Sequence, residues 1–278
     1  MTIHEILKEA AETLARAGVP DSRLDAEFLL AHVLNVSRME LTLRGREALS
    51  PAALASYGIL LSRRQSREPL QYILASQSFM GLDLYVDDSV LIPRPETELL
   101  CEQALMWLRK QSLPSFRVLD LCTGSGALAV AVACQEYTAQ VFATDISDQA
   151  LAVAKKNAKI HNAEVTFFKG DFLSSVSGLQ FDLIVCNPPY IPAAQCETLQ
   201  EEVLYEPRIA LDGGADGLHF YRKLALEAPH CLHPGGALFC EVGYGQAQAV
   251  SELFAPAFAQ IEVYNDLNRI PRIVSAIS

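Results

Sequence analysis

The sequence has little positive charge: 22 Lys and Arg stand against 33 Asp and Glu, which gives a formal net charge of -11. Tracking many phosphates requires clustered Lys and Arg, so a broad nucleic-acid surface is not expected. Long hydrophobic runs are also lacking, because the longest, residues 126–134, falls far short of the roughly 18 residues that span a bilayer. The first residues, MTIHEILKEA, contain two acids and no apolar core, so a signal peptide is not expected either.

The 7 cysteines include no C-x-x-C pair and no disulfide framework spacing, which is typical of reduced thiols in the cytosol. His230-Cys-x-His233 offers no evident fourth ligand and precedes a glycine-rich turn, so no metal site is expected. We therefore expect a cytoplasmic monomer that binds neither a metal, nor nucleic acid directly, nor a membrane. Hydrophobic residues make up 50% of the 278, enough for a buried core in one large or two ordinary domains.

Residues 1–72 are predicted to be helical. Gly18 and Pro20 end a first amphipathic helix, a second is predicted over 23–34, and Ser50-Pro51 starts a third that ends near residue 65. The first helix repeats apolar residues at helical spacing, namely Ile3, Ile6, Leu7, Ala10 and Leu14. The basic cluster Arg63, Arg64 and Arg67 indicates a solvated helix face, with a contact to an acidic or RNA-like partner as the alternative.

The pattern changes after this helical region. Residues 73–95 are predicted to form a linker with a β-hairpin around Gly81, and residues 96–278 an α/β domain that starts with a helix to about residue 110. From Arg117 onward short apolar strands alternate with helices, which indicates a parallel sheet covered on both faces. The predicted strands are 117–121, 140–144, 164–168, 181–186, 236–242, 260–264 and 272–276, and the predicted helices are 127–135, 148–161 and 220–228.

A glycine loop, Asp120-Leu-Cys-Thr-Gly-Ser-Gly126, follows the first of these strands. In a doubly wound sheet this turn lies at the crevice where cofactors bind, and glycine lets the ligand approach the backbone. The loop has neither the G-K-[ST] of a P-loop nor the full G-x-G-x-x-G of a dinucleotide site. Asp145 ends the second strand, where a carboxylate can accept from both ribose hydroxyls, and Asp171-Phe172 follows the third, placed for an adenine. S-adenosylmethionine is the expected cofactor, with NAD as the alternative.

Asn187-Pro-Pro-Tyr190 follows the strand Phe181–Cys186 directly, at a carboxyl edge where α/β sheets hold their sites. Neither proline can donate to a ladder, so the carbonyls are free to face a ligand. Asn187 offers an acceptor and a donor, and Tyr190 a flat ring. These groups suit a planar NH2 on a conjugated carbon, such as an amide or an adenine, held with its lone pair toward a sulfonium methyl.

Strand, glycine loop, two acids and N-P-P-Y together resemble the class I methyltransferases that alkylate planar nitrogens. The flanking sequences narrow the resemblance to the PrmC/HemK family, whose members methylate the glutamine of the Gly-Gly-Gln loop in peptide chain release factors. The similarity covers essentially the whole chain. Its motifs are Pro69-Leu-Gln-Tyr-Ile73, Phe79-Met-Gly-Leu82, Leu91-Ile-Pro-Arg-Pro-Glu-Thr-Glu-Leu99, Asn187-Pro-Pro-Tyr-Ile191, Tyr205-Glu-Pro-Arg208, Ala210-Leu-Asp-Gly-Gly214 and Asp216-Gly-Leu218.

The resemblance implies a Rossmann-like S-adenosylmethionine-dependent methyltransferase domain, with S-adenosylhomocysteine as product, and a small helical N-terminal domain that docks the release factor. It also implies residue roles. The methionine part of the cofactor would contact Cys122, Thr123, Gly124, Ser125 and Gly126, the ribose Asp145, and the adenine Asp171 and Phe172. The substrate amide would contact Asn187, Pro188, Pro189 and Tyr190, with Asn187 also bridging to the cofactor and Arg94 and Glu96 lining the same mouth.

One residue departs from the family pattern: Cys122 stands where the family usually has glycine, a replacement that is tolerated if its φ stays negative. Three alternatives stay open. They are a nucleic-acid adenine-N6 methyltransferase, disfavoured by the negative charge, a ribosomal-protein glutamine methyltransferase, which only the helical domain separates from the leading assignment, and a cofactor-binding regulator without catalysis, disfavoured by the intact tetrapeptide.

Overall fold

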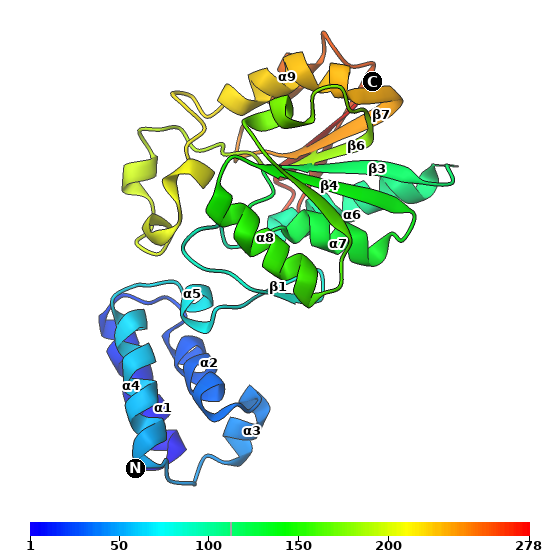
Figure 1. The fold of residues 1–278 in the computed structure, drawn as a ribbon. Coiled ribbons are helices and arrows are strands. Elements are labelled where there is room, and N and C mark those ends of the chain that lie inside the picture. Colours follow the sequence, from blue (N-terminus) through cyan, green and yellow to red (C-terminus); the bar gives the residue numbers. More distant parts are fainter. Residues whose placement is uncertain (112) are drawn as a thin grey trace. The chain divides into compact units, whose positions relative to one another are not determined.

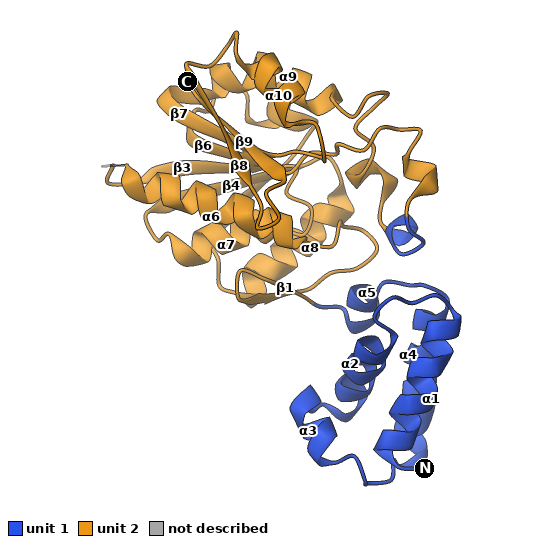
Figure 2. Cartoon of the chain, turned by 180° about the vertical axis from the view of Figure 1, so that it is seen from behind, with its two compact units in different colours: residues 1–76, 200–205 blue, residues 77–199, 206–278 orange. Residues whose placement is uncertain are grey.

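The structure is a computed structural model that describes residues 1–111 and 113–278. The chain forms two compact units (Figure 2). The first contains residues 1–76 together with the short segment 200–205, and the second contains residues 77–199 and 206–278. The first unit is therefore built from two pieces of chain that are far apart in the sequence.

The first unit is helical. Its core buries Ile3, Ile6, Ala10 and Leu14 from α1, so the apolar period predicted for this helix is confirmed. Side-chain caps start α1, α3 and α4, and in α4 Ser50 accepts the N–H of Ala53. Two short helices, α3 and α5, contain too few residues to show a period and are not predicted. The five helices are α1 (Ile3–Arg16), α2 (Ser22–Leu34), α3 (Arg38–Leu43), α4 (Pro51–Gln65) and α5 (Leu70–Leu74).

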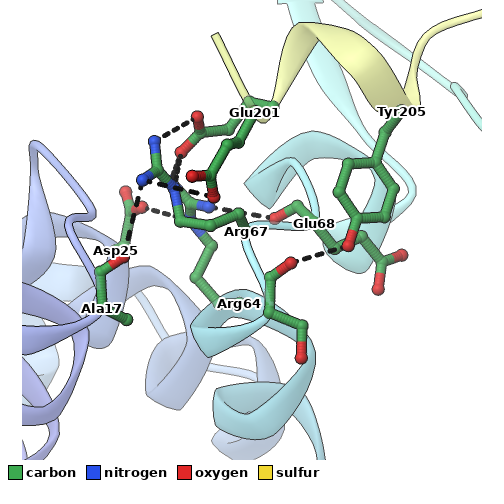
Figure 3. Close-up of polar contacts among 9 residues, drawn as sticks. Ala17, Asp25, Arg64, Arg67, Glu68, Glu201 and Tyr205 are labelled. Carbon is green, nitrogen blue, oxygen red and sulfur yellow. Dashed lines mark hydrogen bonds and ion pairs between the residues drawn. The ribbon is translucent and has the colours of Figure 1, made fainter.

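The basic cluster at the end of α4 is not a solvated face. Arg64 is only 5% exposed, and its guanidinium donates to Asp25 Oδ2 at 2.7 Å and to Glu202 Oε1 at 2.9 Å (Figure 3). Arg67 donates to the two carboxylate oxygens of Glu202 at 2.8 and 2.5 Å. The expectation of a solvated face is wrong for these two arginines, because carboxylates of this same unit neutralise them.

Segment 200–205 makes a second attachment within the first unit. The hydroxyl of Tyr205 donates to the backbone carbonyl of Ser66 at 2.6 Å (Figure 3). Together with the two arginines, this bond holds both Glu202 and Tyr205 against the C-terminal end of α4 and the turn after it. Nothing in the sequence pattern separates this segment from the surrounding loop.

The second unit contains the sheet. The ranges predicted for 127–135 and 181–186 coincide with α7 and β6, and the hairpin around Gly81 is present as β1 and β2. Its elements are β1 (Gln77–Phe79), β2 (Leu82–Leu84), α6 (Pro95–Lys110), β3 (Phe116–Leu121), α7 (Ala127–Gln135), β4 (Ala139–Asp145), α8 (Asp148–Ile160), β5 (Val165–Lys169), β6 (Phe181–Cys186), α9 (His219–Cys231), β7 (Leu232–Glu241), α10 (Ala247–Phe254), β8 (Gln260–Asn265) and β9 (Pro271–Ile277).

The seven-stranded sheet has the order β5-β4-β3-β6-β7-β9-β8. Strands β3 to β7 are parallel, but β9 is antiparallel to both β7 and β8. The predicted parallel sheet is therefore confirmed for β3 to β7, but β9 departs from it, because residues 266–270 between β8 and β9 are too few for the crossover that parallel neighbours need.

Helices cover both faces of this sheet, as predicted. α6, α7 and α8 lie on one face, and α9 and α10 on the other (Figure 1 and Figure 2). Each layer has its own buried apolar cluster, with Leu100 and Val130 in one and Tyr221 and Leu224 in the other. Over residues 1–111 and 113–278, no helix has the length and apolar character needed to cross a membrane.

Candidate active site

The strand order reverses between β3 and β6, which pair in the sheet although β4 and β5 lie between them in the sequence. Such a switch point leaves a crevice outside the carboxyl ends of the strands, where α/β proteins bind ligands. A pocket lies at this point. Its wall includes these predicted site residues: Cys122, Thr123, Gly124, Ser125, Asp145, Asp171, Phe172, Asn187 and Pro189.

The side chain of Asp120 fixes the glycine loop after β3 by two hydrogen bonds. Its Oδ2 accepts the hydroxyl of Thr123 at 2.5 Å and the N–H of Ala129 at 3.0 Å, which connects the loop to the first turn of α7. Gly126 has φ +82°, and a Cβ there would meet the Ala154 backbone at 3.0 Å. Gly126 thus serves the packing of α7 against α8, and it is not among the described residues on the pocket wall.

Cys122 adopts φ +63°. The condition under which a side chain would be tolerated there, a negative φ, is therefore not met. The left-handed conformation brings Cβ close to the following carbonyl and costs an L-residue about 1–2 kcal/mol. Strain of this kind gathers at functional sites where the surroundings over-determine the backbone. Phe172, also on the wall, has φ +57° and so shares this conformation with Cys122.

Asp145, at the end of β4, fixes two turns of backbone. Its Oδ2 accepts the N–H of Gly124 and its Oδ1 the N–H of Ser147, both at 2.9 Å. Burial raises the pKa of this carboxyl, and the backbone N–H groups act in the opposite direction. Each oxygen of a carboxylate has a further lone pair, so the group can still accept from a ligand in the pocket.

Asp171 and Phe172 follow β5 and differ in their surroundings. Phe172 is buried, and its ring centroid lies 5.8 Å from that of Phe220, which also lines the pocket. Asp171 pairs with Lys223 Nζ at 3.1 Å. The two phenyl rings thus offer an apolar surface to a flat ligand, while the Asp171 carboxylate is partly neutralised by a lysine.

The tetrapeptide after β6 faces two directions. Asn187 and Pro189 line the pocket, and the side chain of Asn187 donates from Nδ2 to Thr97 Oγ1 at 3.1 Å. The Tyr190 hydroxyl donates to the buried carboxylate of Glu241 at 3.2 Å. Pro188 and Tyr190 are not among the described wall residues.

Arg94 and Glu96 are each engaged in an ion pair. Arg94 pairs with the carboxylate of Glu206, which also accepts the N–H of Ile92, and Glu96 lies 3.6 Å from Arg272. Neither is among the described wall residues, whereas Thr97, their neighbour on α6, is.

The electrostatics of the wall distinguish between ligands. Three carboxylates line it, those of Asp120, Asp145 and Asp171, and the described lining residues include no Lys, Arg or His. Asp120 Oδ1 is buried and has no hydrogen-bond partner among the described residues, and burial raises the pKa of this carboxyl to about 7. A cationic ligand with N–H donors fits this wall, whereas a pyrophosphate would meet like charge.

Sequence reasoning missed two residues of this site, Thr97 and Glu241. Glu241 is 2% exposed and ends β7, directly beside the end of β6, because Cys186 and Cys240 are partners in the parallel register. A charged residue that ends an otherwise apolar strand was the available signal. No sequence signal indicated Thr97. Its neighbours Arg94 and Glu96 were predicted to line the site instead. In the described part of the chain, no group of three or more His, Cys, Asp or Glu is placed to hold a metal.

Two family models match the chain. Residues 5–74 match the PrmC N-terminal domain, and residues 97–215 match the methyltransferase small domain. The release factor glutamine methyltransferase of Geobacter sulfurreducens is 46% identical over 275 residues, covering 98% of this chain and 95% of that protein. The enzyme of the same name from Moorella thermoacetica is 45% identical, covering 91% of this chain and 89% of its own.

Solved structures share the fold at low identity. A methyltransferase from Pyrococcus furiosus has a TM-score of 0.53 at 20% identity, covering 71% of this chain and 89% of its own. A T. thermophilus 16S rRNA methyltransferase in complex with AdoMet and guanosine has a TM-score of 0.54 at 18% identity, covering 73% of this chain and 49% of its own. These similarities establish the Rossmann-like methyltransferase fold.

Proposed function

The chain belongs to the release factor glutamine methyltransferase family, and from this premise we infer that it transfers a methyl group from S-adenosylmethionine to N5 of the glutamine in the Gly-Gly-Gln motif of peptide chain release factors. The modification supports translation termination. The observation that carries the proposal is that the glycine loop after β3 and Asn187 after β6 line one pocket at the switch point.

The pocket suits this cofactor. Its carboxylates favour a sulfonium and an ammonium group, and the unpartnered Asp120 Oδ1 offers an acceptor. Asp145 would accept from the ribose hydroxyls, and Phe172 would contact the adenine. When bound, S-adenosylmethionine supplies an electrophilic methyl group. The absence of Lys and Arg from the described wall residues favours it over NAD, the alternative, whose pyrophosphate is anionic.

The residues of the tetrapeptide would bind and orient the glutamine amide. We assign the two N–H bonds of that amide to Asn187 Oδ1 and the carbonyl of Pro188, with Pro189 and Tyr190 completing the site. The amide nitrogen then presents its lone pair away from both acceptors. No general base is required, because the nitrogen can lose its proton after the methyl is gained; orientation and differential binding of the transition state supply the rate.

Mass spectrometry of a purified release factor, incubated with enzyme and cofactor, tests the reaction. We expect one methyl group on the Gly-Gly-Gln glutamine. Asn187→Ala should reduce the single-turnover rate by about 10²–10³, the usual cost of a lost transition-state contact, with cofactor affinity retained. Methylation of a ribosomal-protein glutamine or of nucleic-acid adenine in place of the release factor would contradict the assignment, as would a near wild-type rate for Asn187→Ala.

Residues 1–72 are proposed to dock the release factor, and a linker, residues 73–95, joins them to the methyltransferase domain, residues 96–278. Support comes from the pocket wall, to which no described residue before Ser89 contributes. The helical unit also exposes Met39 and Leu43, at 77% and 81%. Replacing both by Asp should raise KM for the intact release factor but not for a short Gly-Gly-Gln peptide. Leu267→Asp, at an exposed site of the second unit, is the control. An equal effect on both substrates would contradict docking.

A further inference from the structure

Glu241 is a buried carboxylate to which the predicted site assigns no part. Its Oε2 accepts the hydroxyl of Thr97 at 2.6 Å, and its Oε1 accepts the hydroxyl of Tyr190 at 3.2 Å. A buried charge is costly unless it is hydrogen-bonded. Here both bonds lead to the site: one directly to the last residue of the tetrapeptide, and the other through Thr97 to Asn187, the first residue.

The directions of these bonds follow from the chemistry of the groups. An ionised carboxylate only accepts, so the single hydroxyl hydrogen of Thr97 is donated to Glu241. The oxygen of Thr97 can then only accept from a further partner. The group of Asn187 that faces it must be the NH2, and Nδ2 does lie 3.1 Å from Thr97 Oγ1. The network therefore leaves Oδ1, the acceptor of the amide, for a ligand in the pocket.

We propose that Glu241, acting through Thr97, is a positioning residue that sets the amide of Asn187 with Oδ1 toward the substrate and Nδ2 away from it. The proposal rests on the proposed function and deepens it. A flipped Asn187 would present a donor to the donor NH2 of the glutamine, which would prevent binding of the nucleophile. Glu241 touches neither substrate nor cofactor and is not itself a catalytic residue.

The hydroxyl of Tyr190 donates to the other oxygen of the same carboxylate, Oε1 of Glu241. Burial raises the pKa of its phenol, and the neighbouring Glu241 raises it further, so the hydroxyl stays neutral and donates. Both oxygens of Glu241 are thus held by donors on different elements, Thr97 on α6 and Tyr190 after β6. Because both of its oxygens are fixed, Glu241 holds the Thr97 hydroxyl, and through it the Asn187 amide, in one orientation.

Protonation of Glu241 would remove this control. Burial raises its pKa to about 7, opposed by the hydrogen bonds from Thr97 and Tyr190. The charged groups that act on it are Glu96, which raises the pKa, and Arg272, which lowers it; Cys240 and Tyr221 are buried beside it with raised pKa values and stay neutral. Below pH 7 the acid carries its own hydrogen, Thr97 can turn its hydroxyl toward Asn187, and the amide is free to flip. The rate should fall as the pH falls through 7.

Single-turnover methyl transfer to an intact release factor, at saturating cofactor, tests the proposal. Thr97→Val and Glu241→Gln should lower the rate by roughly 10²-fold, the effect of a misplaced reacting group. The affinity for S-adenosylmethionine, measured by calorimetry, should change less than about twofold, because the Thr97 hydroxyl is already engaged by Glu241 and Asn187 and Glu241 is not among the described wall residues. Thr97→Ser, which restores the hydroxyl, should recover most of the rate.

Tyr221→Phe is the matched control. The Tyr221 hydroxyl donates to the backbone carbonyl of Glu241 at 2.9 Å, so this change perturbs the same strand end and leaves the carboxylate contacts in place. Its single-turnover rate should stay near that of the wild type. The wild-type profile should show an acidic limb near pH 7 that Glu241→Gln lacks, which a merely structural role would not produce.

Wild-type rates for folded Thr97→Val and Glu241→Gln between pH 6 and 9 would overturn the positioning role and leave the proposed function intact. If Glu241→Gln does not fold, Thr97→Val and its Ser counterpart decide alone. A wild-type enzyme that binds cofactor but methylates no release factor would instead overturn the proposed function.

Discussion

Arg67 and Glu202 form a two-point ion pair across 135 positions of sequence, with both guanidinium–carboxylate distances at 2.8 Å or less. Paired bonds of this kind fix the orientation of both groups and are stronger than a single contact. Burial disfavours the charge on Glu202, but the bonds from Arg67 and Arg64 outweigh it and lower its pKa to about 2. The pair is therefore a stabilising contact within the helical unit.

Replacing Glu202 by Gln should lower the free energy of unfolding by about 1–3 kcal/mol at pH 7, as expected for bonds to a charged group. The folded pKa lies below the ordinary value of 4.5. The contribution is therefore present above about pH 4.5 and is lost as the pH falls toward 2. Urea unfolding of both proteins over this range should show the difference closing. Glu201→Gln, at an exposed neighbour 3.6 Å from Arg67, is the control, and equal losses would contradict the pairing.

Asp145→Asn should weaken S-adenosylmethionine binding by about 1–3 kcal/mol, because an acceptor-only carboxylate is replaced by a group that also donates. Isothermal titration calorimetry measures the change. Asp148→Asn serves as control, since Asp148 is exposed and pairs with Lys169. Unchanged affinity for Asp145→Asn would remove this residue from the cofactor site.

Cys122→Gly should raise the free energy of unfolding by about 1 kcal/mol, because glycine adopts φ +63° without the strain that a Cβ brings. Thermal unfolding without cofactor is the measurement. A lower melting temperature would show that packing of the thiol outweighs the backbone strain.

Replacing glycine by alanine should change the free energy of unfolding in opposite directions at Gly126 and Gly58. Gly126→Ala places a Cβ 3.0 Å from the Ala154 backbone at φ +82°, so it should destabilise the protein by more than about 1 kcal/mol. Gly58 lies within α4, and a Cβ there meets nothing within 4 Å. Gly58→Ala should stabilise by roughly 0.5–1 kcal/mol, the helix preference for alanine. Equal changes in the free energy of unfolding, measured with denaturant, would contradict the close approach of Gly126 to the backbone of α8.

Local patterns predicted much of this molecule because they depend on near neighbours in sequence. The helix α1 was predicted from the apolar spacing of Ile3, Ile6, Ala10 and Leu14. The apolar run 181–186 predicted β6 and placed Asn187 at its end. The partners of Asn187 could not be read in this way. Thr97 and Glu241 are 144 positions apart and meet only because α6 packs beside the ends of β6 and β7. The same holds for Glu202 and its arginines, and for the direction of β9, which a strand pattern does not encode.

The return of Gln200–Tyr205 to the helices has a consequence for recombination. An exchange of the N-terminal region alone between relatives would bring in a new α4 and leave the old Glu202 and Tyr205 behind. Glu202 would then lose Arg64 and Arg67 as partners unless the new α4 and the turn after it carry arginines at the same two positions. A functional chimera must therefore take residues 1–76 and 200–205 from the same parent, because together they form one compact unit.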